Sequence, residues 1–444
     1  MWEDSPESEL ITPEDEARLF ATSLDGLVLA EENGQTVIKG GKLGKLVERL
    51  TLIAMPDWDY ISAFVMTHHS FTTSFDLLEA LINRYETALP PGLTESTFDQ
   101  FIKKAIVPVR LRVCTVIRMW IEMHFEEDLA VSDSLVMRLQ DFIDKRSGVD
   151  LSTMSSRITM PRVLLPRHHD LAQYLMTEPR GFMEIDPQEL ARQLSIMEFS
   201  FFQRVKVWEC LDQIWGDRRK KEARAYGTKV PEDVAESSGG ISSMIKHTNK
   251  LTNWIAQVVI TADTIKGRIN CIKYFVMLAA QCREIRNFNA ITAISAGLSQ
   301  ASVGRLKKTW SAFAESHGRT YELYKEISAL VSPRGQYAEY RKTLKEMTPP
   351  AIPFLGVYLT DLTFIELGNT DFLPDGGYIN FEKRRKVAHI IRSIQSYQLH
   401  PYHFMPVIAI QEFIHGLHAT MSEDEMYEKS LQVEPREDDI SDDE

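Results

Sequence analysis

Apolar residues recur three and four positions apart through most of this chain, and that spacing restricts it to folds in which helices pack on helices. The clearest apolar faces are Leu43, Leu46, Val47 and Leu50; Leu77, Leu78 and Leu81; and Val387, Ile390, Ile391 and Ile394. Each face is a stripe along one side of a helix, and such a stripe has to be buried against another element. We therefore predict an all-α protein made of two packed helical modules.

Changes in composition divide the chain into five segments. We expect a disordered lead-in at residues 1–24, a helical module at 25–145, a serine-rich linker at 146–164, a second helical module at 165–436 and an acidic tail at 437–444. The first module is expected to be helical from Val37 onward. In the second module Asn380 is expected to cap a helix. The basic residues of that helix, which should stay in solvent, are Lys383, Arg384, Arg385 and Lys386.

The start of one helix in the second module is clearly marked. Asp186 is a suitable N-cap, Pro187 fits the first helical turn, and Glu189 stands at the position of a capping box. The broad apolar face predicted for this helix consists of Leu190, Leu194, Met197, Phe201, Val205 and Trp208.

The chain is acidic, with a formal charge of −13 and a pI near 5.5. Nucleic acid and anionic membranes carry the same sign of charge, so neither is expected as the main partner. No apolar run approaches the length of a membrane span, and the N-terminus shows no signal-peptide pattern. We expect a cytoplasmic protein that does not itself insert into a membrane.

Motifs for bond-breaking chemistry are not found in the sequence. The glycines at residues 40–44 lack the spacing of a phosphate loop, so we interpret them as a turn that leads into a helix. His68 and His69 are adjacent and therefore point about 100° apart on a helix, which does not match paired metal ligands. His124, with the acidic residues 126–128, is interpreted as an exposed helix end. We predict no metal, no cofactor and no covalent catalysis.

Several blocks, in order, resemble the family of Ras guanine nucleotide exchange factors. Residues 37–41, 46–51, 67–71 and 109–113, with Trp120, are similar to the family's N-terminal exchanger motif. The blocks similar to its catalytic domain are residues 186–194, 245–254, 286–290, 305–310, 349–362, 379–388 and 430–436. The residues at 362–364 lean toward those of fungal members of the family.

The resemblance implies an exchange factor that accelerates GDP release from a Ras-subfamily small GTPase. In that family the second module carries a protruding helical hairpin, which is inserted beside the nucleotide while the module grips the switch regions. The first module is expected to support the hairpin by packing against it. The nucleotide-free GTPase should be the form bound best, because only differential affinity shifts an equilibrium. Recruitment to membranes would come through the GTPase or through other domains.

The hairpin's first arm is implied at residues 353–367 and its return arm after Asn380. The family usually places an apolar residue and a glutamate at the wedge positions of the first arm. Here these positions are Thr363 and Leu367, and Glu366 lies about 100° from that face. Leu367 cannot mimic phosphate charge, whereas Thr363 can still crowd out magnesium. These departures argue against exchange driven by acidic competition, while steric wedging remains open.

Other residues are implied to bind the GTPase, several of them in a pocket for a tyrosine of its second switch. They are Ile245, Lys246, Thr248, Thr292, Ser299, Tyr337, Phe354, Lys383, Arg384, Arg385 and Lys386. From the residues alone, the apolar ones also fit ordinary core packing and the basic ones a solvated helix face.

Two alternatives to exchange activity stay open. One is a scaffold that binds a GTPase without opening its nucleotide site, which the departures at Thr363 and Leu367 would allow. The other is an enzyme with an unrecognised pocket, for which no acid–base or nucleophile set is visible.

Overall fold

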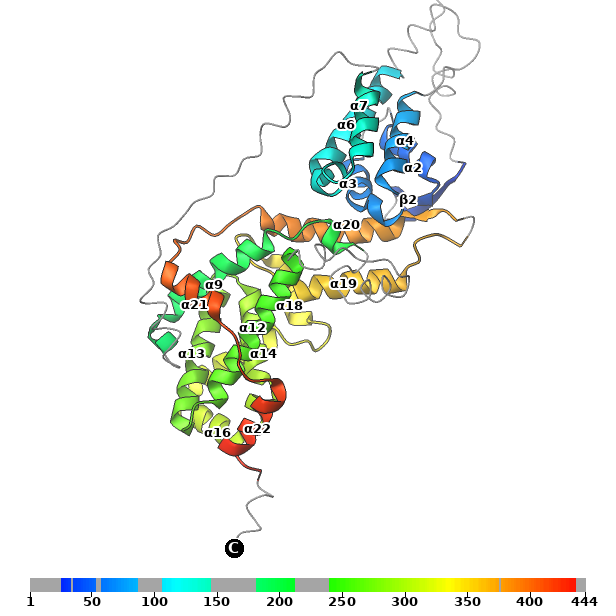
Figure 1. Cartoon of the computed structure of the whole chain (residues 1–444). Coiled ribbons are helices and arrows are strands. Elements are labelled where there is room, and N and C mark those ends of the chain that lie inside the picture. Colours follow the sequence, from blue (N-terminus) through cyan, green and yellow to red (C-terminus); the bar gives the residue numbers. More distant parts are fainter. Residues whose placement is uncertain are drawn as a thin grey trace, which may run out of the picture. The chain divides into compact units, whose positions relative to one another are not determined.

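The computed structural model describes residues 25–32, 35–52, 57–86, 106–144, 181–211, 239–374 and 377–436 (Figure 1). The predicted lead-in at 1–24, linker at 146–164 and tail at 437–444 lie outside these residues. The described chain is predominantly helical, which confirms the predicted fold class. It also contains a small antiparallel sheet, which the sequence analysis missed.

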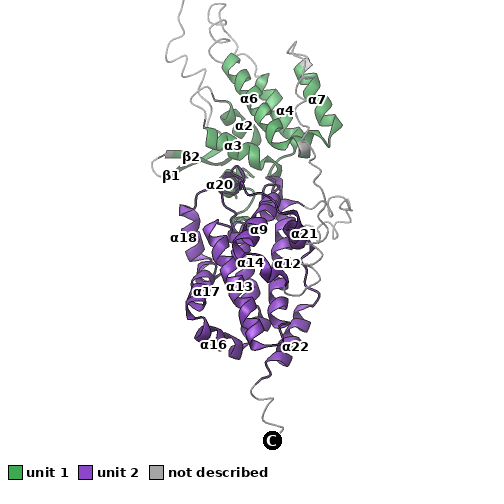
Figure 2. Ribbon diagram, turned by 90° about the vertical axis from the view of Figure 1, so that its left-hand side faces the viewer, with its two compact units in different colours: residues 1–162, 362–391 green, residues 163–361, 392–444 purple. Residues whose placement is uncertain are grey.

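The chain forms two compact units, and neither is continuous in sequence (Figure 2). Unit 1 comprises Met1–Arg162 and Leu362–Ile391, and unit 2 comprises Val163–Asp361 and Arg392–Glu444. The division falls inside two helices, α19 (Leu355–Gly368) and α20 (Phe381–Gln398). Most of the predicted hairpin therefore groups with the N-terminal part of the chain.

The helices of unit 1 bury the apolar faces that the spacing predicts. Leu46, Val47 and Leu50 are buried on one helix, and the face from Leu77 to Leu81 is buried on another. A side-chain oxygen caps two of the helix starts: Asp57 Oδ1 accepts from the Tyr60 backbone N–H at 2.9 Å, and Thr73 caps in the same way. The helices of the N-terminal part are α2 (Leu43–Leu50), α3 (Trp58–Thr67), α4 (Ser74–Tyr85), α6 (Val107–His124) and α7 (Asp133–Asp144).

The sheet of unit 1 consists of β1 (Leu27–Glu32), β2 (Gln35–Gly41) and β3 (Ile379–Asn380), in that order. The prediction that the chain is helical from Val37 onward is therefore wrong for β2, where β-branched residues favour a strand. Gly40 is needed for close approach of the strands, because a Cβ there would lie 2.4 Å from the Ile379 carbonyl oxygen. The glycines at 40 and 41 thus end a strand and are not a turn.

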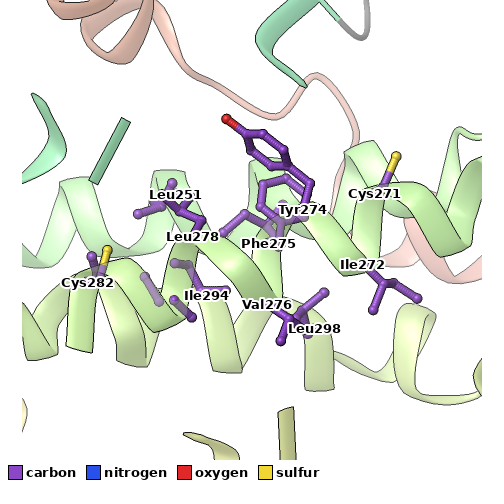
Figure 3. Close-up of a cluster of buried hydrophobic side chains, with 14 of the residues drawn as sticks. Leu251, Cys271, Ile272, Tyr274, Phe275, Val276, Leu278, Cys282, Ile294 and Leu298 are labelled. Atoms are coloured by element: carbon purple, nitrogen blue, oxygen red, sulfur yellow. The ribbon is translucent and has the colours of Figure 1, made fainter. Parts of the chain in front are cut away.

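The core of unit 2 is centred on one helix, α13 (Ile265–Glu284), which packs against helices on several sides. Its Phe275 and Leu278 are fully buried beside Leu251 and Ile294 of neighbouring helices (Figure 3). The surrounding helices are α9 (Pro187–Phe202), α12 (Gly240–Ile260), α14 (Phe288–Ser299), α15 (Ala301–Gly304), α16 (Lys307–Ser316), α17 (Gly318–Leu330), α18 (Ala338–Glu346), α21 (Ile408–Gly416) and α22 (Glu423–Val433).

Helix α9 begins where predicted and buries Leu190 and Leu194 of its predicted face. The Asp186 side chain accepts from the Gln188 backbone N–H at 2.8 Å, which confirms the N-cap. The helix ends at Phe202, so Val205 and Trp208 lie beyond it, although Val205 is buried as predicted. Its buried face runs through Leu194, Glu198 and Phe199, and Met197 and Phe201 lie at the edge. Polar residues share this buried face, which an apolar pattern alone cannot reveal.

The structure also corrects the interpretation of His124 as an exposed helix end. Its side chain is buried in unit 1, as is that of Asp128. Among the described residues, no helix is both long and apolar enough to cross a membrane.

Candidate functional site

The predicted hairpin is present as helices α19 and α20, joined through a loop that contains β3. The loop is held by a bridge between Phe372 and Ile379 and by a hydrogen bond from the Leu373 N–H to the Tyr378 carbonyl at 2.7 Å. Asn380 caps the return arm, since its Oδ1 accepts from the Lys383 N–H at 3.2 Å. The sequence thus identified both arms and the cap between them.

The tip of the first arm exposes apolar side chains. Leu367 is 66% exposed and Phe364 is 57% exposed, whereas Thr363 is only partly exposed. Sequence reasoning missed Phe364. The available signal was the closeness of Leu362, Phe364 and Ile365, because three apolar residues within four positions of a helix cannot all face one core.

The return arm buries two cations. Lys383 is 1% exposed, and its Nζ donates to Glu366 Oε1 and to Asp371 Oδ1, both at 2.9 Å. Arg384 is 2% exposed, and its guanidinium donates to Asp371 at 2.7 Å and to the Ser70 carbonyl at 3.0 Å. These contacts correct the expectation that both residues are solvated: carboxylates on the hairpin compensate their charges in the buried position.

The same network fixes the ionisation of Asp371. Burial alone would raise the pKa of this carboxyl, but hydrogen bonds and charges from Lys383 and Arg384 outweigh burial and lower its pKa below the usual value. Glu366, which lies beside the wedge positions in sequence, is engaged by Lys383 and so turned toward the return arm.

The remaining two basic residues of the return arm are more accessible. Arg385 pairs with Glu32 at 2.9 Å, and exposed Lys386 pairs with Glu382 of its own helix at 2.8 Å. Contacts within unit 1 also attach the start of this arm to the N-terminal helices, since the rings of Phe381 and Tyr60 lie 4.6 Å apart. Unit 1 therefore holds the hairpin tip by strand pairing, ring contacts and ion pairs.

Two of the predicted pocket residues meet in unit 2. The rings of Tyr337 and Phe354 lie 5.8 Å apart, and the Phe354 N–H donates to the Tyr340 hydroxyl at 2.8 Å. Gly356 makes this position of the Phe354 ring possible, because a Cβ at residue 356 would lie 2.3 Å from it. Tyr337 itself has a left-handed backbone, with φ of 61°.

The other predicted contact residues lie on helices α12 and α14. Ile245 and Lys246 are exposed on α12. The Thr248 hydroxyl donates to Met244 O at 2.8 Å and to Asn289 Oδ1 at 3.1 Å, which joins the two helices. On α14 the hydroxyls of Thr292 and Ser299 donate to backbone carbonyls of their own helix.

Two hydrogen bonds set the alignment of helices α12 and α14. Thr248 meets Asn289, and Thr252 meets Ala293, so the helices run parallel. With about 1.5 Å of rise per residue, Ile245 and Thr292 lie roughly 9 Å apart along this pair. The contacts described within residues 239–374 thus bring Tyr337 and Phe354 together and align α12 with α14.

Comparison with known proteins places both parts of the chain in one family. Residues 189–385 match the RasGEF domain, and residues 37–142 match the RasGEF N-terminal motif. The chain is 32% identical to Ras guanine nucleotide exchange factor P of Dictyostelium discoideum, over 93% of this chain and 27% of the relative. It is 29% identical to cell division control protein 25 of Candida albicans, over 90% of this chain and 30% of the relative.

A third relative, protein son of sevenless of Drosophila melanogaster, is 28% identical over 96% of this chain and 28% of its own length. The chain thus spans only about a quarter to a third of these three curated relatives. The two matched domains stand in the order that the sequence blocks indicated, and together they include the hairpin's first arm and the start of its return arm. This chain belongs to the Ras guanine nucleotide exchange factor family.

Proposed function

We propose that this chain accelerates GDP release from a Ras-subfamily small GTPase, with the hairpin of α19 and α20 placed beside the nucleotide. The family match and the names of the relatives support exchange activity. The observation that carries the mechanism is the exposed apolar tip of the first arm, formed by Phe364 and Leu367. Large exposed apolar groups on a rigid element are typical of surfaces that a partner covers.

The tip favours steric displacement over acidic competition. Leu367 offers an apolar group where phosphate mimicry would need a carboxylate. Glu366 is the nearest acid in sequence, and Lys383 holds it at 2.9 Å within the hairpin. A wedge of this kind opens the magnesium and phosphate sites by occupying space, with Thr363 and Leu367 as the positions that face them.

Exchange by this route requires tighter binding of the empty GTPase than of the loaded one. A factor that bound both forms equally would not shift the equilibrium, however tightly it bound. We expect a stable complex with the nucleotide-free GTPase and its dissociation on addition of GDP or GTP. No covalent step is needed.

The remaining residues divide between contact and support. Exposed Ile245 and Lys246, together with the Tyr337–Phe354 pair, suit contact with the switch regions, because aromatic anchors dominate many interfaces. Buried Lys383 and Arg384 are positioning residues of the hairpin. Thr248, Thr292 and Ser299 have hydroxyls engaged inside unit 2 and would contribute mainly surface shape.

The test is release of a fluorescent GDP analogue from Ras, Rap, Ral and Rho-type GTPases, with and without the full chain. We expect strong acceleration for a Ras-subfamily member. Leu367→Ala should slow that exchange about fivefold, as expected for loss of a contact worth about 1 kcal/mol. Leu399→Ala is the matched control, because Leu399 is equally apolar and 76% exposed but lies outside the hairpin tip.

Two outcomes would contradict the proposal. A folded chain that accelerates release from no GTPase, but still binds the nucleotide-free form, would be a scaffold. Equal exchange rates for Leu367→Ala and Leu399→Ala would show that the exposed tip takes no part in exchange.

A further inference from the structure

Three histidine side chains meet inside unit 1, far in sequence from the hairpin. His68 and His69 directly follow α3, and His124 is the last residue of α6. One ring nitrogen from each lies within 4.8 Å of the others. The ring centroids are 3.9 Å apart for His68 and His69, 4.9 Å for His68 and His124, and 4.8 Å for His69 and His124.

Each ring has one nitrogen held by an acceptor from the protein. His68 Nδ1 lies 2.8 Å and His124 Nε2 lies 3.0 Å from the carbonyl oxygen of Val65, which can only accept. His69 Nε2 lies 2.6 Å from Asp128 Oδ1. These nitrogens therefore carry the protons, and in a neutral ring the other nitrogen presents a lone pair. This pairing of imidazole N–H groups with carbonyl and carboxylate is the usual outer support of metal-binding histidines.

The lone pair on His68 Nε2 lies in an unfavourable environment. His68 Nε2 is buried and makes no hydrogen bond, and it lies 3.5 Å from Asp128 Oδ2. That carboxylate oxygen already accepts from Trp120 Nε1 at 2.6 Å. A buried lone pair beside a carboxylate is costly unless a cation lies near both.

We propose that His68, His69 and His124 bind one divalent zinc ion, with Val65 and Asp128 orienting the rings. Three imidazole ligands suit zinc, which accepts nitrogen donors in a tetrahedral arrangement. With Zn–N bonds of about 2.0 Å the nitrogens stand roughly 3.3 Å apart, so binding draws the rings together by small side-chain rotations. Water, or Asp128 itself, completes the fourth position.

An access route leads from solvent to the cluster. A surface cavity of about 730 Å³ is lined by His69 and by residues of the following turn and α4, among them Phe71, Thr73 and Asp76. The His69 side chain is 25% exposed, whereas the His68 side chain is fully buried. An ion arriving through the cavity meets His69 first.

Zinc at this point links the end of α3 to the end of α6, and both helices belong to unit 1. The ion is therefore structural. Any ligand that binds only the folded state raises its stability. Zinc is not expected to change the chemistry of exchange.

The test uses the full chain, prepared metal-free with a chelator and then dialysed against zinc. We expect one zinc per chain by elemental analysis, a rise in Tm that the chelator reverses, and a tetrahedral cobalt absorption spectrum when Co²⁺ replaces zinc. His69→Gln should weaken zinc binding at least about 100-fold, because it removes the most accessible ligand. The matched control His418→Gln alters an exposed histidine of unit 2 and should retain the zinc.

Three results would overturn the proposal. These are zinc binding by the folded chain weaker than about 0.1 mM, zinc retained equally by His69→Gln, and a cobalt spectrum typical of six oxygen ligands. The cobalt spectrum is measured on the unmodified chain, so it decides the matter even where His69→Gln does not fold.

Discussion

The two arms of the hairpin differ in which side chains they expose and which they bury. The first arm ends with Phe364 and Leu367 exposed, and the return arm begins with Lys383 and Arg384 buried. A surface helix normally shows the reverse, with apolar groups inside and charges in water. The difference separates two roles: ion pairs fix the return arm, and the first arm presents apolar surface for a partner.

The largest effect is expected at the base of the first arm, where Phe354→Ala removes an aromatic anchor beside Tyr337. We expect exchange to slow about 30-fold or more, which corresponds to roughly 2 kcal/mol. Release of fluorescent GDP from the responsive GTPase measures this. Gly356→Ala should displace the same ring by steric contact and reduce the rate in parallel. Wild-type rates from a folded Phe354→Ala variant would remove Phe354 from the binding surface.

On the return arm, Lys383→Ala should loosen the hairpin, because Glu366 and Asp371 lose the cation between them. Both carboxylates are partly exposed, so we expect the free energy of unfolding to fall by about 1.5 kcal/mol, which is less than the loss expected for a fully buried ion pair. Faster amide hydrogen exchange in α20 measures this loss of stability.

The control on the same helix is Lys386→Ala, which removes an exposed partner of Glu382 four residues before it. Lys386→Ala should lower the free energy of unfolding by only about 0.3 kcal/mol. Equal effects of the two lysine substitutions would mean that burial of Lys383 contributes nothing, and the contrast between the arms would fail.

Leu367→Glu separates the two wedge mechanisms on the first arm. Steric wedging predicts exchange slowed about fivefold, because a hydrated carboxylate replaces the apolar contact. A marked increase in rate would instead mean that phosphate competition operates and that this chain merely lacks the charge. The readout is again fluorescent GDP release, at equal concentrations of folded protein.

The smallest effect concerns the pH dependence of the loop between the arms. The pKa of the Asp371 carboxyl is lower in the folded state than in the unfolded chain. Its ionisation therefore stabilises the fold at any pH above the unfolded pKa. This stabilisation is lost as the pH falls through the folded pKa. Wild type should therefore exceed Asp371→Asn in stability at pH 7 by about 0.5 kcal/mol, since the carboxyl is 47% exposed. The difference in hydrogen exchange of α20 should begin to shrink as the pH falls below about 4, and it should vanish only below the folded pKa. A difference that stayed constant from about pH 5 to about pH 2 would exclude the ion pairs as its cause.

Spacing and capping, which are local, were well predicted from the sequence. The buried faces around Leu46 and Ile391 and the cap at Asn380 follow from residues three or four apart, whereas the position of α19 was implied by the resemblance to the family. The order of sequence blocks indicated the family, because many short matches in sequence order rarely occur by chance. These features depend on neighbours along the chain, and the sequence shows those directly.

The tertiary structure alone decided which polar groups are inside. Arg384 is buried because Ser70 and Asp371 accept from it, and Ser70 lies more than 300 positions away. His124 is buried because Val65 and the His68–His69 pair come from another helix. The short strand β3 exists because it pairs with β2. A charged or polar side chain is stable in the interior only when it has a hydrogen-bonding or ionic partner. Where that partner is distant in sequence, the spacing of nearby residues does not identify it.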